Sequence, residues 1–156
     1  MIASLSYGYN VDVSLIQLAG AYATIANGGI RYPITLRKIE GDIIDGERVL
    51  SEQTSKEIMS MLEKVAIRGA PRAKINGYRI GGKTGTAQIA AANYASDKHN
   101  ALFVGLAPQT KPKIVIAVIV NEPAGKEYYG GQVAAPVFSE IGSHTLRLLG
   151  IAPDDK

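Results

Sequence analysis

Apolar residues recur every three or four positions in three stretches of the chain, a spacing typical of amphipathic helices with one packed face. The helices are expected at residues 13–26, 55–67 and 136–149. For the second helix, Thr54 is the predicted N-cap and Glu57 completes a capping box. The third is predicted to begin near Pro136, which suits a first helical turn. The predicted inner faces carry Leu15, Leu18, Ala19, Tyr22 and Ala26, then Ile58, Met61, Leu62, Val65 and Ala66, then Phe138, Ile141, Thr145 and Leu148.

The second half of the chain contains runs of β-branched and aromatic residues, which favour strands. Strands are expected at residues 78–89, 101–107 and 113–121, and the short turn PQTKP predicts that the last two pair antiparallel. Further extended segments are expected at residues 34–39 and on both sides of Asp45-Gly46, a good hairpin turn. Together these elements predict an α+β fold, in which helices pack on an antiparallel sheet.

Composition and charge exclude several classes of protein. The chain has 156 residues, enough for one domain with a continuous core. Its formal net charge is only +3 and its basic residues are scattered, so nucleic-acid binding is not expected. There is no cysteine, and no His or carboxylate cluster has metal-ligand spacing, so neither a metal nor a cofactor is expected. The longest apolar run, residues 114–120, is too short to span a bilayer, and the first ten residues lack the features of a signal peptide.

Residues 77–88, GYRIGGKTGTAQ, carry the candidate chemistry. From Gly77 to Thr84 they match the phosphate-loop pattern G-x-x-x-x-G-K-[ST], which would make the chain a nucleotide-binding protein. A phosphate loop needs a helix that begins at the Lys-Thr pair, whereas Gly85 and the β-branched Thr86 are poor helix formers. The stretch therefore favours one continuous strand. A flexible glycine-rich turn without any chemistry is a further interpretation.

The same stretch spells K-T-G, the third motif of penicillin-binding proteins and serine β-lactamases. A strand edge with these residues suits a peptide that ends in a carboxylate. Lys83 supplies positive charge, and the hydroxyls of Thr84 and Thr86 can donate hydrogen bonds to the anion. Gly85 lets a substrate backbone approach closely, and a backbone N–H on this edge can face the oxyanion that develops when a carbonyl is attacked. The motif is expected to form half of an acyl-transfer site.

The wider sequence resembles the C-terminal part of the transpeptidase domain of class B penicillin-binding proteins, nearest to the division-specific type. The resemblance covers nearly the whole chain. It rests on VSLIQLAGAYATIANGG, on GYRIGGKTGTAQ, on ALFVGLAP followed by IVIAVIVNEP, and on YYGGQVAAPVFSEI. It implies the fold that penicillin-binding proteins share with serine β-lactamases. Val13-Ser14 stands where the family often has Thr-Pro.

The resemblance implies a role for each residue of the motif. Lys83 would hydrogen-bond to the serine of the family's second motif, and the N–H of Thr86 would form half of the oxyanion hole. Thr84, Gly85 and Thr86 would hold the carboxylate end of a stem peptide that terminates in D-Ala-D-Ala, or that of a β-lactam. Tyr129 would line the pocket, although an ordinary loop aromatic that covers the sheet explains this tyrosine equally well.

The parent protein implied by the resemblance is a peptidoglycan D,D-transpeptidase that works through an acyl-serine intermediate. It would be anchored in the bacterial cytoplasmic membrane with this domain on the periplasmic side. Its partners would be stem peptides, β-lactam antibiotics and membrane proteins of a division complex. A serine β-lactamase or β-lactam sensor shares K-T-G, but the YGG…AAPVF segment and the helix before the motif argue against it.

The family's nucleophile lies in an S-x-x-K motif, and its second motif is S-x-N. No serine of the chain has Lys three residues later or Asn two residues later; those tested are Ser4, Ser6, Ser14, Ser51, Ser55, Ser60, Ser96, Ser139 and Ser143. Both motifs precede K-T-G in the family. Residues 1–156 are therefore expected to be the C-terminal part of a transpeptidase domain whose other segments lie upstream. Taken alone, such a chain would be a non-catalytic binding module.

The isolated 156-residue chain is expected to form no covalent adduct with a penicillin, because none of its serines has an activating lysine in S-x-x-K spacing. Labelled penicillin, followed by a denaturing gel and intact mass spectrometry, measures the adduct. A mass increase equal to one β-lactam, mapped to a serine of this chain, would contradict the placement of the nucleophile upstream.

Overall fold

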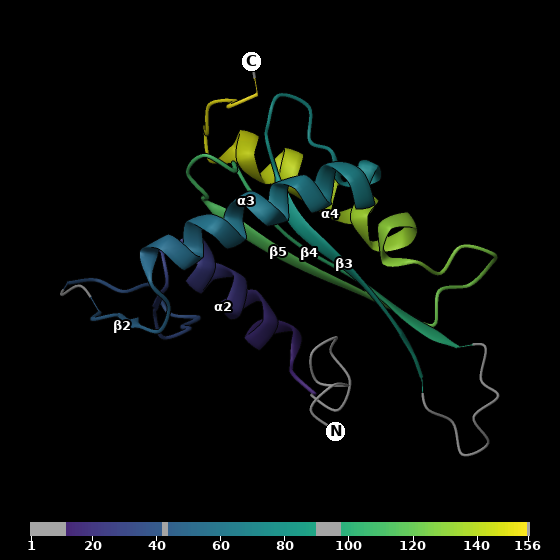
Figure 1. The fold of residues 1–156 in the computed structure, drawn as a ribbon, viewed down its shortest axis with the longest axis horizontal. Coiled ribbons are helices and arrows are strands. Elements are labelled where there is room, and N and C mark those ends of the chain that lie inside the picture. The colour runs from purple at the N-terminus through teal and green to yellow at the C-terminus, as the bar shows by residue number, and fades with distance from the viewer. Residues whose placement is uncertain (1–11, 42–43, 90–97, 156) are drawn as a thin grey trace.

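A three-stranded antiparallel sheet lies at the centre of the structure, a computed structural model that describes residues 12–41, 44–89 and 98–155 (Figure 1). Its strands are β3 (Gly81–Gln88), β4 (His99–Ala107) and β5 (Ile114–Asn121), in the order β3-β4-β5. β4 is central and largely buried, whereas β3 is an edge strand within the described part of the chain. All three predicted strands are confirmed, although the first begins at Gly81 instead of residue 78.

Helices cover both faces of this sheet (Figure 1). They are α2 (Leu15–Ala26), α3 (Glu52–Gly69) and α4 (Gly130–Leu148), with a short 3-10 helix, η1, at Pro71–Ala73. Gly105 of β4 faces Phe138 of α4. The next residue, Leu106, points to the opposite face, where Gly81 beside it approaches Leu62 of α3. This arrangement confirms the predicted α+β fold. None of the helices in the described ranges is long and apolar enough to cross a membrane.

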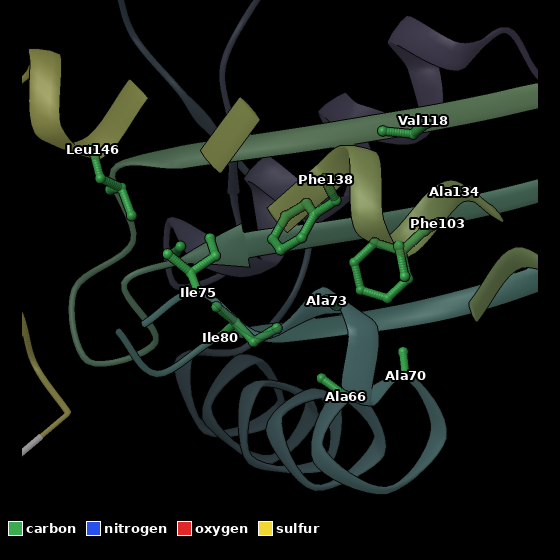
Figure 2. Close-up of a cluster of buried hydrophobic side chains, with 12 residues drawn as sticks. Ala66, Ala70, Ala73, Ile75, Ile80, Phe103, Val118, Ala134, Phe138 and Leu146 are labelled. Atoms are coloured by element: carbon green, nitrogen blue, oxygen red, sulfur yellow. The ribbon is translucent and has the colours of Figure 1, made fainter. Parts of the chain in front are cut away.

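The core lies between α4, the end of α3 and the sheet, and two phenylalanines are among its largest buried side chains (Figure 2). Phe103 of β4 and Phe138 of α4 are fully buried, and their rings meet edge to face with centroids 4.9 Å apart. Glycines make room for them. A Cβ at Gly105 would lie 2.7 Å from the Phe138 ring, and one at Gly82 would lie 2.6 Å from the Phe103 ring. These glycines allow α4 to lie close to the sheet.

Two helices begin earlier than predicted. α3 has Ser51 as its N-cap instead of Thr54, because the Ser51 hydroxyl accepts a hydrogen bond from the Thr54 N–H at 3.0 Å. α4 begins at Gly130, and Pro136 lies inside the helix instead of at its start. The first helix, α2, is confirmed within two residues of its predicted bounds.

The predicted inner faces are correct for some positions and wrong for others. Leu62, Ala66 and Phe138 are buried as expected, whereas 54% of Met61 and 87% of Leu148 is exposed. The buried residues of α4 are Gly130, Ala134, Ala135, Phe138, Gly142 and Leu146. Most of them are small because the helix lies close to the sheet, and a pattern based on large apolar residues does not identify such a face.

The segment between α2 and α3 is paired differently from the prediction, and residues 42 and 43, on one side of the predicted hairpin at Asp45-Gly46, lie outside the described residues. Residues 34–39 form no strand, and the pairing joins β1 (Ile30–Arg31) to β2 (Glu47–Arg48) instead. The cause lies at Gly29, whose carbonyl oxygen accepts hydrogen bonds from the N–H groups of Val49 and Leu50 at 2.9 and 3.1 Å. These bonds draw the chain after β2 back to the end of α2.

The C-terminal tail, residues 150–155, is hydrogen-bonded to the segment just before β3. One oxygen of the Asp154 carboxylate accepts a hydrogen bond from the Arg79 backbone N–H at 2.8 Å. The other accepts from the backbone N–H and the hydroxyl of Thr110, at 3.1 and 2.8 Å. The N–H groups of Asp154 and Asp155 both donate to the Gly77 carbonyl oxygen at 3.1 Å. One carboxylate therefore joins the chain just before K-T-G-T to the turn between β4 and β5.

Phe138→Ala is expected to lower the free energy of unfolding by about 3–5 kcal/mol, the usual cost of deleting a buried phenylalanine ring. Leu148→Ala on the same helix is the matched control, because this exposed side chain predicts a change within about 0.5 kcal/mol. Urea denaturation followed by circular dichroism measures both. Equal losses in the two variants would contradict a core between α4 and β4.

Candidate functional site

The K-T-G-T residues occupy consecutive positions of the edge strand β3, and the register with β4 determines where each side chain points. Thr84 is opposite Phe103, which contacts α4. Paired residues share a face of the sheet, and so do residues two apart in a strand. Thr84 and Thr86 therefore both lie on the α4 side. Lys83 and Gly85 alternate to the other face.

β3 runs without interruption from Gly81 to Gln88, so Lys83 and Thr84 lie inside a strand. A phosphate loop would require a helix that begins at these two residues, with its N-terminus aimed at the phosphates. The strand occupies that position, and the nucleotide-binding interpretation loses its physical basis. The Lys83 ammonium is exposed and donates a hydrogen bond to the Thr84 carbonyl oxygen at 2.7 Å.

A shallow cavity of about 400 Å³, which we call the threonine cavity, lies beside the two threonines. The side chains and backbone that line it include Arg72, Thr84, Thr86, Tyr129, Gly130 and Gln132. It brings together three of the predicted site residues, the two threonines and Tyr129, whereas Lys83 and Gly85 do not line it. A larger cavity of about 700 Å³ lies between α2 and the segment 31–47, and none of the predicted site residues lines it.

One wall of the threonine cavity is formed by residues 129–132. We call this segment, together with residues 127 and 128, the tyrosine turn. The Gly130 N–H donates a hydrogen bond to Thr86 Oγ1 at 3.2 Å. A hydroxyl that accepts this bond keeps its own proton available, so Thr86 can present an O–H to an anion in the cavity. The turn also packs closely on the sheet. A Cβ at Gly130 would overlap the Leu102 carbonyl oxygen and lie 2.6 Å from that of Gly85.

The two tyrosines of this turn have different surroundings. Tyr129 lines the threonine cavity, and 53% of it is exposed. The Tyr128 ring stacks on His99 of β4 with centroids 4.3 Å apart, and its hydroxyl donates to that of Tyr129 at 3.1 Å. This hydrogen bond raises the pKa of the Tyr128 phenol. Tyr128 therefore packs at the end of the sheet, whereas Tyr129 is available to a ligand; its role in substrate binding stays a prediction.

Sequence reasoning missed one charged side chain at the cavity, Arg72 in η1. Its guanidinium donates to both oxygens of the Glu127 carboxylate, at 2.8 and 3.1 Å, and to the Gln132 carbonyl oxygen at 3.1 Å. The hydrogen bond from Arg72 lowers the pKa of Glu127. The pair is therefore complete above the ordinary pKa of a glutamate and is lost as the pH falls through the lowered value.

Three of the described serines take structural positions away from the cavity. Ser14 and Ser51 cap α2 and α3, and the Ser139 hydroxyl donates to the Lys74 carbonyl oxygen. No serine among the described residues lines the threonine cavity. In the same ranges there is no group of three or more His, Cys, Asp or Glu side chains that could hold a metal ion. Three further serines, Ser4, Ser6 and Ser96, lie outside the described residues.

Comparison with known proteins gives the same family at the level of sequence and of structure. Residues 1–143 match the family model "Penicillin binding protein transpeptidase domain". The chain is 39% identical over 155 residues to "Peptidoglycan D,D-transpeptidase FtsI" of Escherichia coli K12, a match that covers 97% of this chain and 26% of the relative. It is 36% identical over 154 residues to "Probable peptidoglycan D,D-transpeptidase PenA" of Neisseria meningitidis serogroup A, with the same coverage of 97% and 26%.

Among solved structures, the chain is similar to the apo transpeptidase domain of Burkholderia pseudomallei penicillin-binding protein 3. The TM-score is 0.88 at 44% identity, and the match covers 97% of this chain and 47% of the solved chain. The chain thus spans about a quarter of the length of the two curated relatives and about half of this solved domain.

Gly130→Ala is expected to destabilise the protein by about 1–3 kcal/mol, because the added Cβ would force the tyrosine turn away from β3. Gly69→Ala at the end of α3 is the matched control, since a Cβ there meets nothing within 4 Å. Thermal denaturation compares the two variants. A loss in Gly130→Ala no larger than that in the control would contradict the close packing of the turn on the sheet.

Proposed function

The chain belongs to the penicillin-binding protein transpeptidase family, and we propose that residues 1–156 form the C-terminal part of the transpeptidase domain of a peptidoglycan D,D-transpeptidase. The observation that carries the proposal is the position of Thr84 and Thr86 beside the threonine cavity, on one face of the strand that also bears Lys83. Similarity to relatives named peptidoglycan D,D-transpeptidases, over nearly the whole of this chain, supports it.

In this proposal, the threonine cavity holds the terminal carboxylate of a stem peptide that ends in D-Ala-D-Ala. The hydroxyls of Thr84 and Thr86 donate hydrogen bonds to the carboxylate, and the Lys83 ammonium on the same strand adds positive charge. Gly85 lets the peptide backbone approach the strand. A penicillin carries a carboxylate in a comparable position relative to its reactive carbonyl, so the same residues bind β-lactams. The ring of Tyr129 borders the bound ligand.

The acyl transfer needs a serine from a segment upstream of this chain. Its oxygen attacks the carbonyl of the penultimate D-Ala, and the terminal D-Ala leaves with a proton. The amine of a second stem peptide then takes the acyl group and restores the serine. The Thr86 N–H faces the oxyanion that forms in each step, and Lys83 donates a hydrogen bond to the serine of the S-x-N motif.

The complete protein is proposed to lie in the bacterial cell envelope, with this domain on the periplasmic side of the cytoplasmic membrane and an anchor outside the present chain. Membrane proteins of a division complex are its proposed partners. The resemblance of K-T-G-T and its flanking segments to the division-specific type supports this assignment.

Lys83→Ala in the full-length protein is expected to slow acylation by penicillin severely. Lys83 is exposed in the free protein, and where the bound penicillin carboxylate desolvates the pair, truncation of one member costs about 2–5 kcal/mol, which is a loss of more than tenfold in rate. Lys64→Ala, at an exposed position of α3, is the matched control and should acylate at the normal rate. Stopped-flow measurement of acyl-enzyme formation compares them. A normal rate in Lys83→Ala would remove the basis for the K-T-G assignment.

A further inference from the structure

We propose that Arg72 is a positioning residue that holds the tyrosine turn against β3 and so determines the shape of the threonine cavity. The proposal rests on the proposed function, because it takes this cavity as the site of the substrate carboxylate. Arg72 lies in η1, before β3, whereas the turn follows β5. The guanidinium therefore links two segments that are distant in the sequence and that both border the cavity.

Arg72 contacts both ends of the turn. Its two hydrogen bonds to the Glu127 carboxylate hold the first residue, and its bond to the Gln132 carbonyl oxygen holds the last. Tyr129 lies between these two points. A planar guanidinium with several fixed donors can bind a carboxylate and a carbonyl at once, which the single ammonium group of a lysine does less well.

The contact with Gln132 has a cause in the sequence of α4. In an α-helix, the carbonyl of residue 132 accepts a hydrogen bond from the N–H of residue 136. That residue is Pro136, which has no N–H, so the Gln132 carbonyl lacks its helical donor. The Arg72 guanidinium supplies a donor at 3.1 Å. The proline inside the helix thereby creates the acceptor that Arg72 uses.

The opposite side of the turn is held by β3 itself. Gly130 donates to Thr86 Oγ1 and packs on the backbone of Gly85 and Leu102. The turn is thus fastened between Thr86 on one side and Arg72 on the other. Tyr129, which is more than half exposed, is not itself part of the buried core. Its position is held by these two attachments and by Tyr128, whose hydroxyl donates to that of Tyr129 and whose ring stacks on His99. Loss of Arg72 would remove the attachment to η1.

The experiment compares Arg72→Ala with Arg31→Ala in the full-length protein. Arg31 forms an exposed ion pair with Glu47 away from the threonine cavity, so it is a matched arginine control. Hydrogen–deuterium exchange reports the opening of peptides that cover residues 127–132. Stopped-flow acylation by penicillin separates the dissociation constant from the acylation rate constant. Both readouts are needed, because an ordinary loss of stability would not be confined to this turn.

For Arg72→Ala, we expect faster exchange in the tyrosine turn and a roughly tenfold to hundredfold lower second-order rate constant of acylation, as for a displaced substrate-positioning group. Most of this decrease should come from a higher dissociation constant for penicillin, since the threonine cavity that binds the carboxylate is affected. Arg31→Ala should change neither quantity. Slower acylation with normal exchange would overturn the proposal, because Arg72 would then contact the ligand directly. Faster exchange with normal acylation would overturn it too.

A second comparison tests the carbonyl contact. In Pro136→Ala, the new N–H at residue 136 can bond to the Gln132 carbonyl within the helix. Arg72→Ala should therefore accelerate the hydrogen exchange of residues 127–132 less in the Pro136→Ala protein than in the protein with Pro136. Equal acceleration in the two backgrounds would contradict the role of the proline. If the unmodified full-length protein forms no penicillin adduct, the proposed function fails. The exchange of residues 127–132 would still decide whether Arg72 holds the turn.

Discussion

The antiparallel pairing of β3 with β4 is the constraint on which the candidate site depends. Side chains alternate along a strand, so a shift of one residue in this pairing would turn Thr84 and Thr86 to the opposite face and remove their hydroxyls from the threonine cavity. The register is held by Phe103, which lies opposite Thr84 and packs on Phe138 in the core. The same pair of strands therefore carries both the phenylalanine contact of the core and the residues of the candidate site.

Small residues let α4 approach the sheet closely enough to form the threonine cavity. Gly105 allows α4 to lie close to the sheet, and Gly130 and Gly131 allow its first turn to reach β3. A Cβ at Gly131 would lie 3.1 Å from the Gly69 carbonyl oxygen and 3.4 Å from the Thr84 methyl group. The start of α4 thus contacts the end of α3 as well as the strand. Larger residues at these positions would separate the three elements that surround the cavity.

Features that depend on neighbouring residues could be predicted from the sequence, whereas those that depend on distant contacts could not. The β-branched run of β5 and the K-T-G-T strand are local patterns, and both strands lie close to where they were expected. Pro136 misleads the prediction, because the sequence looks the same whether a proline begins a helix or lies inside one. In the second case it leaves the carbonyl four residues earlier, that of Gln132, to a donor from another segment. Arg72 and Glu127 are 55 residues apart, and nothing in their spacing indicates that they pair.

The hydrogen bonds between the C-terminal tail and the residues just before β3 can form only late in the synthesis of the chain. The ribosome adds residues 77–79 long before it adds Asp154, yet the Arg79 N–H and the Gly77 carbonyl find their partners only in the tail. On a nascent chain, the whole of β3 can pair with β4 as soon as β4 emerges, whereas the residues just before β3 gain these hydrogen bonds only after the tail has been synthesised. The pairing that places K-T-G-T can therefore form before the hydrogen bonds that hold the segment leading into it.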